Sequence, residues 1–231
     1  MTKWFVSIHG DRADIDQYPA WFPDGPIFAI RKDEGVYLTG AAFETLKTAE
    51  EVHAAAMEAL DEFAAAVSVL DTHSKIPKTG GVVREDDDGK RHFTMFAEAG
   101  HFQIRGHAAA VFVSGAKPER RATEAQRLLE QARRNKHLLA AASIWAELPR
   151  SWSRLYRIMQ ELERYLRQPL DKAGYCSRNE RERFTRSANS AEASGKDARH
   201  AIGMYKPPSN PMSVREGRLF IHRMLQRALR S

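Results

Sequence analysis

Residues 111–134, VFVSGAKPERRATEAQRLLEQARR, contain the point at which the pattern of the chain changes. Before this point, short runs of β-branched and aromatic residues alternate with Gly, Pro and Asp, which is typical of strands joined by turns. After Pro118, apolar residues recur every three or four positions, as in a helix that buries one face. The sequence therefore predicts an α+β protein. We expect an acidic β-rich region over residues 1–116 and a basic helical region over residues 117–231.

The first region is predicted to form a small, mainly antiparallel sheet with one helix. Its strand-like runs are residues 4–8, 27–30, 36–39, 82–84, 92–96, 102–105 and 111–113. Asp88-Gly89 lies between two of these runs and favours a hairpin turn. Thr48 and Glu51 have the spacing of a capping box, in which each side chain satisfies a free N–H group at a helix start. We expect that helix to extend to about Leu70.

The second region is predicted to contain about four helices. The first covers residues 123–148 and is ended by Pro149, and the second covers residues 151–167. Capping boxes at Ser177 and Ser213 begin the third and fourth. Helical spacing gives the second helix a buried face that includes Trp152, Leu155, Met159 and Leu162. In the fourth, it gives an apolar face of Val214, Phe220, Ile221, Met224, Leu225 and Ala228, opposite Arg215, Arg218, His222, Arg223 and Arg230.

Charge is distributed unevenly along the chain. Residues 1–115 hold 11 Lys and Arg against 18 Asp and Glu, and residues 116–231 hold 25 against 12, so the two parts carry −7 and +13. Twenty of the 25 C-terminal cations are arginine, whose planar guanidinium suits phosphates and carboxylates. Basic ridges are predicted on two helices: Arg120, Arg127 and Arg134, spaced by seven, on the first, and Arg154 and Arg157, with Arg150 and Arg164, on the second. A solvated surface and a high-GC genome are the alternative explanation.

These arginines lead to one hypothesis of function. We expect a non-enzymatic binding protein, in which Arg127, Arg134, Arg154 and Arg157 contact nucleic acid, another polyanion or an acidic protein partner. The sequence leaves the oligomeric state open.

Several classes of site are not expected. Cys176 is the only cysteine, so the chain cannot form an internal disulfide or a four-cysteine zinc site, and a reducing compartment is expected. There is no dinucleotide-binding fingerprint and no metal-ligand spacing such as HExxH, so we expect neither cofactor nor metal. The first residues do not resemble a signal peptide, and the apolar runs are too short to span a membrane. The expectation is a cytoplasmic protein.

Residues 184–190, 194–201 and 207–212, together with 152–161, resemble an uncharacterised bacterial protein family of unknown function. The resemblance covers the C-terminal third and brings no activity with it. Within it, Ser194-Gly195-Lys196 with Arg199 and His200 offers loop N–H groups and cationic side chains to an anion. A structural turn is the alternative reading of this segment.

A second resemblance favours an enzyme. Arg215 and His222 are separated by six residues and lie two helical turns apart, which resembles the Arg-then-His pattern of HEPN-type ribonucleases. Glu216 departs from that pattern, because the family prefers Asn, Asp or His after the arginine. The resemblance implies a HEPN-like ribonuclease or toxin-type nuclease that uses Arg215 with His222, or Arg199 with His200.

Overall fold

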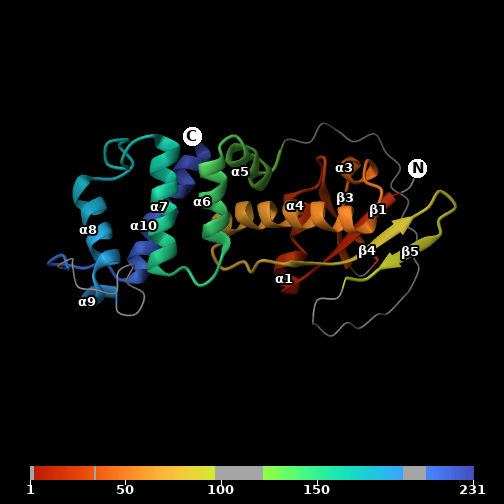
Figure 1. Ribbon diagram of the computed structural model, residues 1–231, viewed down its shortest axis with the longest axis horizontal. Helices are drawn as coiled ribbons and strands as arrows, with labels where there is room; N and C mark the ends of the chain where they lie inside the picture. Colours follow the sequence, from red (N-terminus) through yellow and green to blue (C-terminus); the bar gives the residue numbers. More distant parts are fainter. Residues whose placement is uncertain (1–2, 34, 97–121, 195–206) are drawn as a thin grey trace. The chain divides into compact units, whose positions relative to one another are not determined.

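The computed structural model describes residues 3–33, 35–96, 122–194 and 207–231 (Figure 1). The fold is α+β, with one antiparallel sheet and a C-terminal half that is helical, as the sequence predicts. The chain forms two compact units, Met1–Ala64 with Ser74–Gln126 and Ala65–His73 with Arg127–Ser231. The predicted boundary at residues 116–117 and the predicted strands over residues 102–105 and 111–113 lie outside the described residues.

The sheet of the first unit has five strands in the order β2-β3-β1-β4-β5, and every neighbouring pair is antiparallel. The strands are β1 (Lys3–His9), β2 (Phe28–Lys32), β3 (Gly35–Thr39), β4 (Lys78–Glu85) and β5 (Arg91–Thr94). Val6 in β1 is opposite Leu38 in β3 and Val82 in β4, and all three side chains are buried. Cross-strand apolar contacts of this kind fix the register of a sheet with a buried face.

The hairpin predicted around Asp88-Gly89 is present between β4 and β5. Asp86 and Lys90 face each other across the turn, with the Asp86 N–H donating to the Lys90 carbonyl oxygen at 2.9 Å. Gly89 has a φ of 79°, a left-handed conformation that glycine adopts without steric cost. The acidic run is therefore part of a turn.

The helix predicted from Thr48 to Leu70 is α4 (Ala49–Leu70). Its capping box is formed: the Glu51 N–H donates to Thr48 Oγ1 and the Thr48 N–H donates to Glu51 Oε2, both at 3.2 Å. In the first unit, Phe63 of α4 stacks on Phe22 with ring centroids 3.9 Å apart. Residues 65–70 of α4 belong to the second unit. In the described part of the first unit, three four-residue helices were not predicted: α1 (Arg12–Ile15), α2 (Tyr18–Trp21) and α3 (Ala41–Glu44).

The C-terminal half contains α5 (Glu124–Arg133), α6 (Lys136–Ala146), α7 (Trp152–Leu166), α8 (Arg178–Asn189), α9 (Ala191–Ser194) and α10 (Val214–Arg230). The prediction of one continuous helix over residues 123–148 is wrong, because Asn135 divides it. Asn135 has an extended backbone, and its side-chain oxygen accepts from the His137 N–H at 2.9 Å. Asparagine competes for backbone N–H groups in this way, and it therefore begins α6 as its N-cap.

The core of the second unit agrees with the helical patterns. Trp152, Leu155, Met159 and Leu162 of α7 are buried, as are Phe220, Ile221, Met224, Leu225 and Ala228 of α10, whereas Val214 is only partly covered. The capping boxes at Ser177 and Ser213 are both formed. The two helices run side by side in Figure 1, and Gly217 of α10 is close to the ring of Trp152.

Candidate functional site

The four arginines predicted to contact a polyanion differ in their surroundings. Arg127, Arg134 and Arg157 are exposed, and within the described ranges none of them has a carboxylate partner. Arg134 lies in the turn between α5 and α6 and not on the predicted helix, and its guanidinium donates to Gln131 Oε1 at 3.3 Å. Arg120, predicted on the same ridge, lies outside the described residues. Arg154 is partly covered, forms an ion pair with Glu147 at 3.1 Å and donates to the Pro149 carbonyl oxygen at 3.0 Å. Three of the four therefore keep an uncompensated positive charge at the surface.

Of the two other arginines predicted on the second helix, Arg164 is exposed on α7 as predicted, whereas Arg150 is not on the helix. Arg164 pairs with Glu161 one turn away. Arg150 precedes α7, since Ser151 is the N-cap of that helix. Arg150 is only 7% exposed. The spacing of Arg150 from Arg154 is helical in the sequence, but Arg150 is not on the helix. Its assignment to an exposed ridge is wrong.

Arg150 instead contacts the C-terminal ends of two helices. Its Nε donates to the carbonyl oxygen of Trp145 in the last turn of α6 at 2.7 Å, and its Nη1 donates to that of Thr72, just after α4, at 2.8 Å. The guanidinium also lies over the Trp145 ring, 4.4 Å from its centroid. A cation is favourable at a helix C-terminus, where carbonyl groups lack helical partners. The third nitrogen, Nη2, is buried and has no hydrogen-bond partner.

Side chains from α6 and α10 satisfy the other carbonyl groups at the end of α4. Trp145 Nε1 donates to the carbonyl oxygen of Ser68 at 2.9 Å, and that of Val69 accepts from His222 at 2.8 Å and from Gln226 at 3.3 Å. The His222 ring is stacked on Trp145 at 5.0 Å. His222 is thus partly buried, and its predicted position on the face opposite the apolar residues is wrong. Burial, the main cause, and the nearby charges of Arg150 and Arg230 lower its pKa, although the Val69 hydrogen bond opposes this.

A depression of about 470 Å³ lies beside Arg150 and is lined by Leu148, Pro149, Arg150 and Arg218. Arg218 is exposed and its Nε donates to the Arg150 carbonyl oxygen at 3.0 Å. In the part of the chain that the structure describes, neither arginine forms an ion pair with a carboxylate. Burial and the charge of Arg218 both lower the pKa of Arg150. The depression is therefore electropositive.

No pattern in the sequence groups these residues as a site. The helical spacing predicts Arg218 on an exposed helical face and Arg150 on a basic ridge. No local signal connects them, because Thr72, Trp145 and Arg218 are brought together only by packing of distant segments. The Leu-Pro-Arg run at residues 148–150, between two helices, is the one feature of the sequence that marks the position.

Arg215 and His222, the first candidate nuclease pair, have different surroundings. Arg215 is exposed on α10, while the Nε2 of His222 donates to the Val69 carbonyl oxygen. Arg199 and His200 lie outside the described residues. Cys176 is partly buried, and burial, followed by the carboxylates of Glu180 and Asp171, raises the pKa of its thiol to about 11. Its thiol is therefore protonated at neutral pH.

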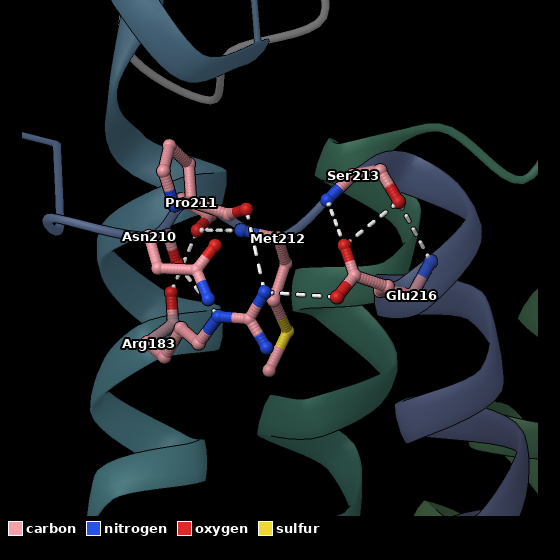
Figure 2. A network of polar contacts seen from close by, with 7 residues as sticks. Arg183, Asn210, Pro211, Met212, Ser213 and Glu216 are labelled. Carbon is pink, nitrogen blue, oxygen red and sulfur yellow. Dashed lines mark hydrogen bonds and ion pairs between the residues drawn. The ribbon is translucent and has the colours of Figure 1, made fainter.

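The segment before α10 is attached to α8 by a polar network (Figure 2). Arg183 of α8 donates to the carbonyl oxygen of Asn210 at 2.7 Å and to Glu216 Oε1 at 2.8 Å. Glu216 Oε2 accepts from the Ser213 N–H at 2.7 Å, and this bond, with the Arg183 interactions, lowers the Glu216 pKa to about 2. Ser187 accepts from the Met212 N–H at 2.8 Å. The described part of this segment thus has a structural role.

Comparisons of the chain with protein-family models, curated proteins and solved structures give no match. Within the described ranges, no cluster of three His, Cys, Asp or Glu side chains is arranged to hold a metal ion. None of the helices in those ranges combines the length and the apolar character that crossing a membrane requires.

Proposed function

We propose that this chain is a non-enzymatic binding protein whose basic helical part contacts a polyanion, with nucleic acid as the first class to test. The observation that carries the proposal is the state of Arg127, Arg134 and Arg157. All three are exposed, and no carboxylate among the described residues neutralises them. Exposed guanidinium groups bind phosphate oxygens and release the counterions that surround a nucleic acid.

Other arginines of the same unit provide the contrast. Arg164, Arg178 and Arg223 pair with Glu161, Glu182 and Glu180. Their charges are partly compensated before any ligand arrives, and the same holds for Arg154. The proposal therefore assigns the main contacts to the three unpaired arginines and a smaller contribution to Arg154.

Catalysis by Arg215 and His222 is not part of the proposal, because no contact of the described residues favours it. The Nε2–H of His222 is used by the Val69 carbonyl oxygen, and the ring is stacked on Trp145. Nδ1 is the ring nitrogen left for acid–base chemistry, and no hydrogen bond of the described residues joins the ring to Arg215. The ribonuclease remains the alternative that the experiment below distinguishes.

The test compares two triple variants for retention of RNA and duplex DNA at several salt concentrations. Arg127→Gln/Arg134→Gln/Arg157→Gln removes the unpaired charges, and Arg164→Gln/Arg178→Gln/Arg223→Gln removes the same number of paired ones. For duplex DNA, we expect the slope of log K against log salt to fall by up to about 3 in the first variant and by less in the second. Circular dichroism establishes that both are folded.

Equal affinity and equal slope in the wild type and the first variant would reject the proposal. The same RNA is also analysed for cleavage on a gel. Intact RNA is expected from a binding protein, whereas cleavage that is lost in His222→Gln would support the ribonuclease.

A further inference from the structure

A buried guanidinium without a carboxylate partner is uncommon in proteins, because removal of a charge from water is costly unless an opposite charge or hydrogen bonds offset it. Arg150 is 7% exposed. The carbonyl oxygens of Trp145 and Thr72 satisfy two of its nitrogens. Nη2 is buried with no hydrogen-bond partner among the described residues, so a side chain that lines the depression keeps one strong donor unsatisfied.

A second guanidinium lines the same depression. Arg218 uses its Nε for the Arg150 carbonyl oxygen, and its two terminal nitrogens donate to no described residue. The carboxylates nearest in the sequence are held by other arginines: Glu147, close to Arg150, pairs with Arg154 at 3.1 Å, and Glu216, close to Arg218, pairs with Arg183 at 2.8 Å. Two positive charges thus line one depression without a described carboxylate to balance them.

The remaining wall of the depression is apolar. It consists of Leu148, which is 53% exposed, and Pro149. A large exposed apolar side chain beside cationic groups suits a ligand that joins an anionic group to an apolar one. An inorganic anion would use only the two arginines.

We propose that Leu148, Pro149, Arg150 and Arg218 form a binding site for a phosphate monoester, beyond the polyanion contacts of the proposed function. The terminal nitrogens of Arg218 and Nη2 of Arg150 donate to the phosphate oxygens, and the organic group of the ester lies against Leu148 and Pro149. A phosphate monoester carries close to two negative charges at neutral pH, which matches two guanidinium groups. Because Nη2 is buried, side chains that line the depression shift when the ligand binds.

The direct test is isothermal titration calorimetry at constant ionic strength with phenyl phosphate, inorganic phosphate and phenol. We expect phenyl phosphate to bind more tightly than inorganic phosphate, and phenol not to bind. Arg218→Gln should weaken phenyl phosphate binding at least tenfold. Arg178→Gln is the matched control, since it removes one exposed positive charge from a surface ion pair, and it should leave the affinity unchanged. Leu148→Ser should reduce the preference for phenyl phosphate over inorganic phosphate.

Arg218 is exposed, so its replacement should leave the fold intact, whereas replacement of Arg150 would remove contacts to two helix ends. Absence of phenyl phosphate binding by the wild type, or an equal loss of affinity in Arg218→Gln and Arg178→Gln, would overturn the proposal.

A 5′-phosphorylated oligonucleotide is compared with its 5′-hydroxyl form. Tighter binding of the phosphorylated form identifies a nucleic-acid end as a source of the phosphate, while equal binding of the two forms, with phenyl phosphate bound as expected, assigns the site to small phosphate esters.

The two proposals fail separately. The variant Arg127→Gln/Arg134→Gln/Arg157→Gln should show weaker salt-dependent retention of polyanions and unchanged phenyl phosphate binding. The variant Arg218→Gln should show weaker phenyl phosphate binding and unchanged retention of polyanions. Binding of phenyl phosphate without polyanion retention would reject the proposed function alone. Retention of polyanions without phenyl phosphate binding would reject the monoester site alone.

Discussion

The Nε2 atom of His222 in α10 lies 2.8 Å from the carbonyl oxygen of Val69 in the last turn of α4. The same end of α4 receives Trp145 at the Ser68 carbonyl oxygen, and Arg150 reaches that of Thr72 just beyond it. Helix ends leave carbonyl groups without helical partners. Three carbonyl groups at the end of α4 and just beyond it are satisfied in this way. Their donors are side chains from α6, from the segment after α6 and from α10.

His222 should make the stability of the protein depend on pH. Burial and the charges of Arg150 and Arg230 lower its pKa in the folded state below the ordinary value of 6.5. His222 therefore takes up a proton more readily in the unfolded chain than in the folded one. The contribution of the neutral ring to the free energy of unfolding is complete above pH 6.5 and is lost as the pH falls below that value.

His222→Gln removes this titration and keeps a side-chain N–H for the Val69 carbonyl oxygen. Urea midpoints at pH 8 and pH 5.5 should therefore differ less in this variant than in the wild type. Arg215→Gln is the control on the same helix and should retain the wild-type difference. An unchanged pH dependence in His222→Gln would contradict the role assigned to this histidine.

Leu155→Ala should lower the free energy of unfolding by about 2 to 5 kcal/mol, because Leu155 is fully buried in α7 and its loss leaves a cavity. Leu219→Ala is the matched control: Leu219 is 62% exposed, and its replacement should change stability by no more than about 0.5 kcal/mol. Urea denaturation of both variants measures the difference. Equal midpoints would show that Leu155 is not part of the core.

Gly217→Ala should destabilise the protein, although alanine is normally favoured over glycine in a helix by about 1 kcal/mol. A Cβ atom at this position would be 2.7 Å from the Trp152 ring, and that overlap should cost about 1 to 3 kcal/mol. Thermal denaturation gives the sign of the change. The same substitution in a Trp152→Leu background should cost less, since the ring is absent. A stabilised Gly217→Ala protein would rule out close packing of α10 on α7.

Ser213→Ala should lower the free energy of unfolding by about 1 kcal/mol, because the N-cap hydroxyl that accepts the Glu216 N–H at 3.2 Å is lost. Ser153→Ala is the comparison: Ser153 is exposed and caps no helix N–H group. Chemical denaturation of the two variants should separate them. If both alter stability equally, the hydroxyl of Ser213 has no capping role.

Much of the fold was predictable because its signals are local. The capping boxes at Thr48, Ser177 and Ser213 depend on residues three positions apart, and each begins a helix in the structure. The turn at Asp88-Gly89 is equally local. The break at Asn135 was missed because apolar residues on both sides continue the helical period, and one side chain decided between a continuous helix and a new N-cap.

The candidate site was less predictable than the fold. Exposure of Arg127 and Arg157 follows from their positions on amphipathic helices, whereas Arg134 lies in the turn between α5 and α6. Whether an arginine keeps its charge free depends on carboxylates that can be distant in sequence, as with Arg223 and Glu180. Spacing along one helix carries no information about such partners.

The sequence by itself determined the positions of the five described strands and of α4, α7, α8 and α10, the buried face of α7 and the excess of arginine in the C-terminal half, since these follow from local patterns and composition. Only the tertiary structure decided that Arg150 is buried and that His222 lies against Trp145. Both outcomes depend on the end of α4, about 80 and 150 positions earlier in the chain, respectively. A side chain is exposed or buried according to what packs over it, and the packing partners here come from segments that the local pattern does not connect.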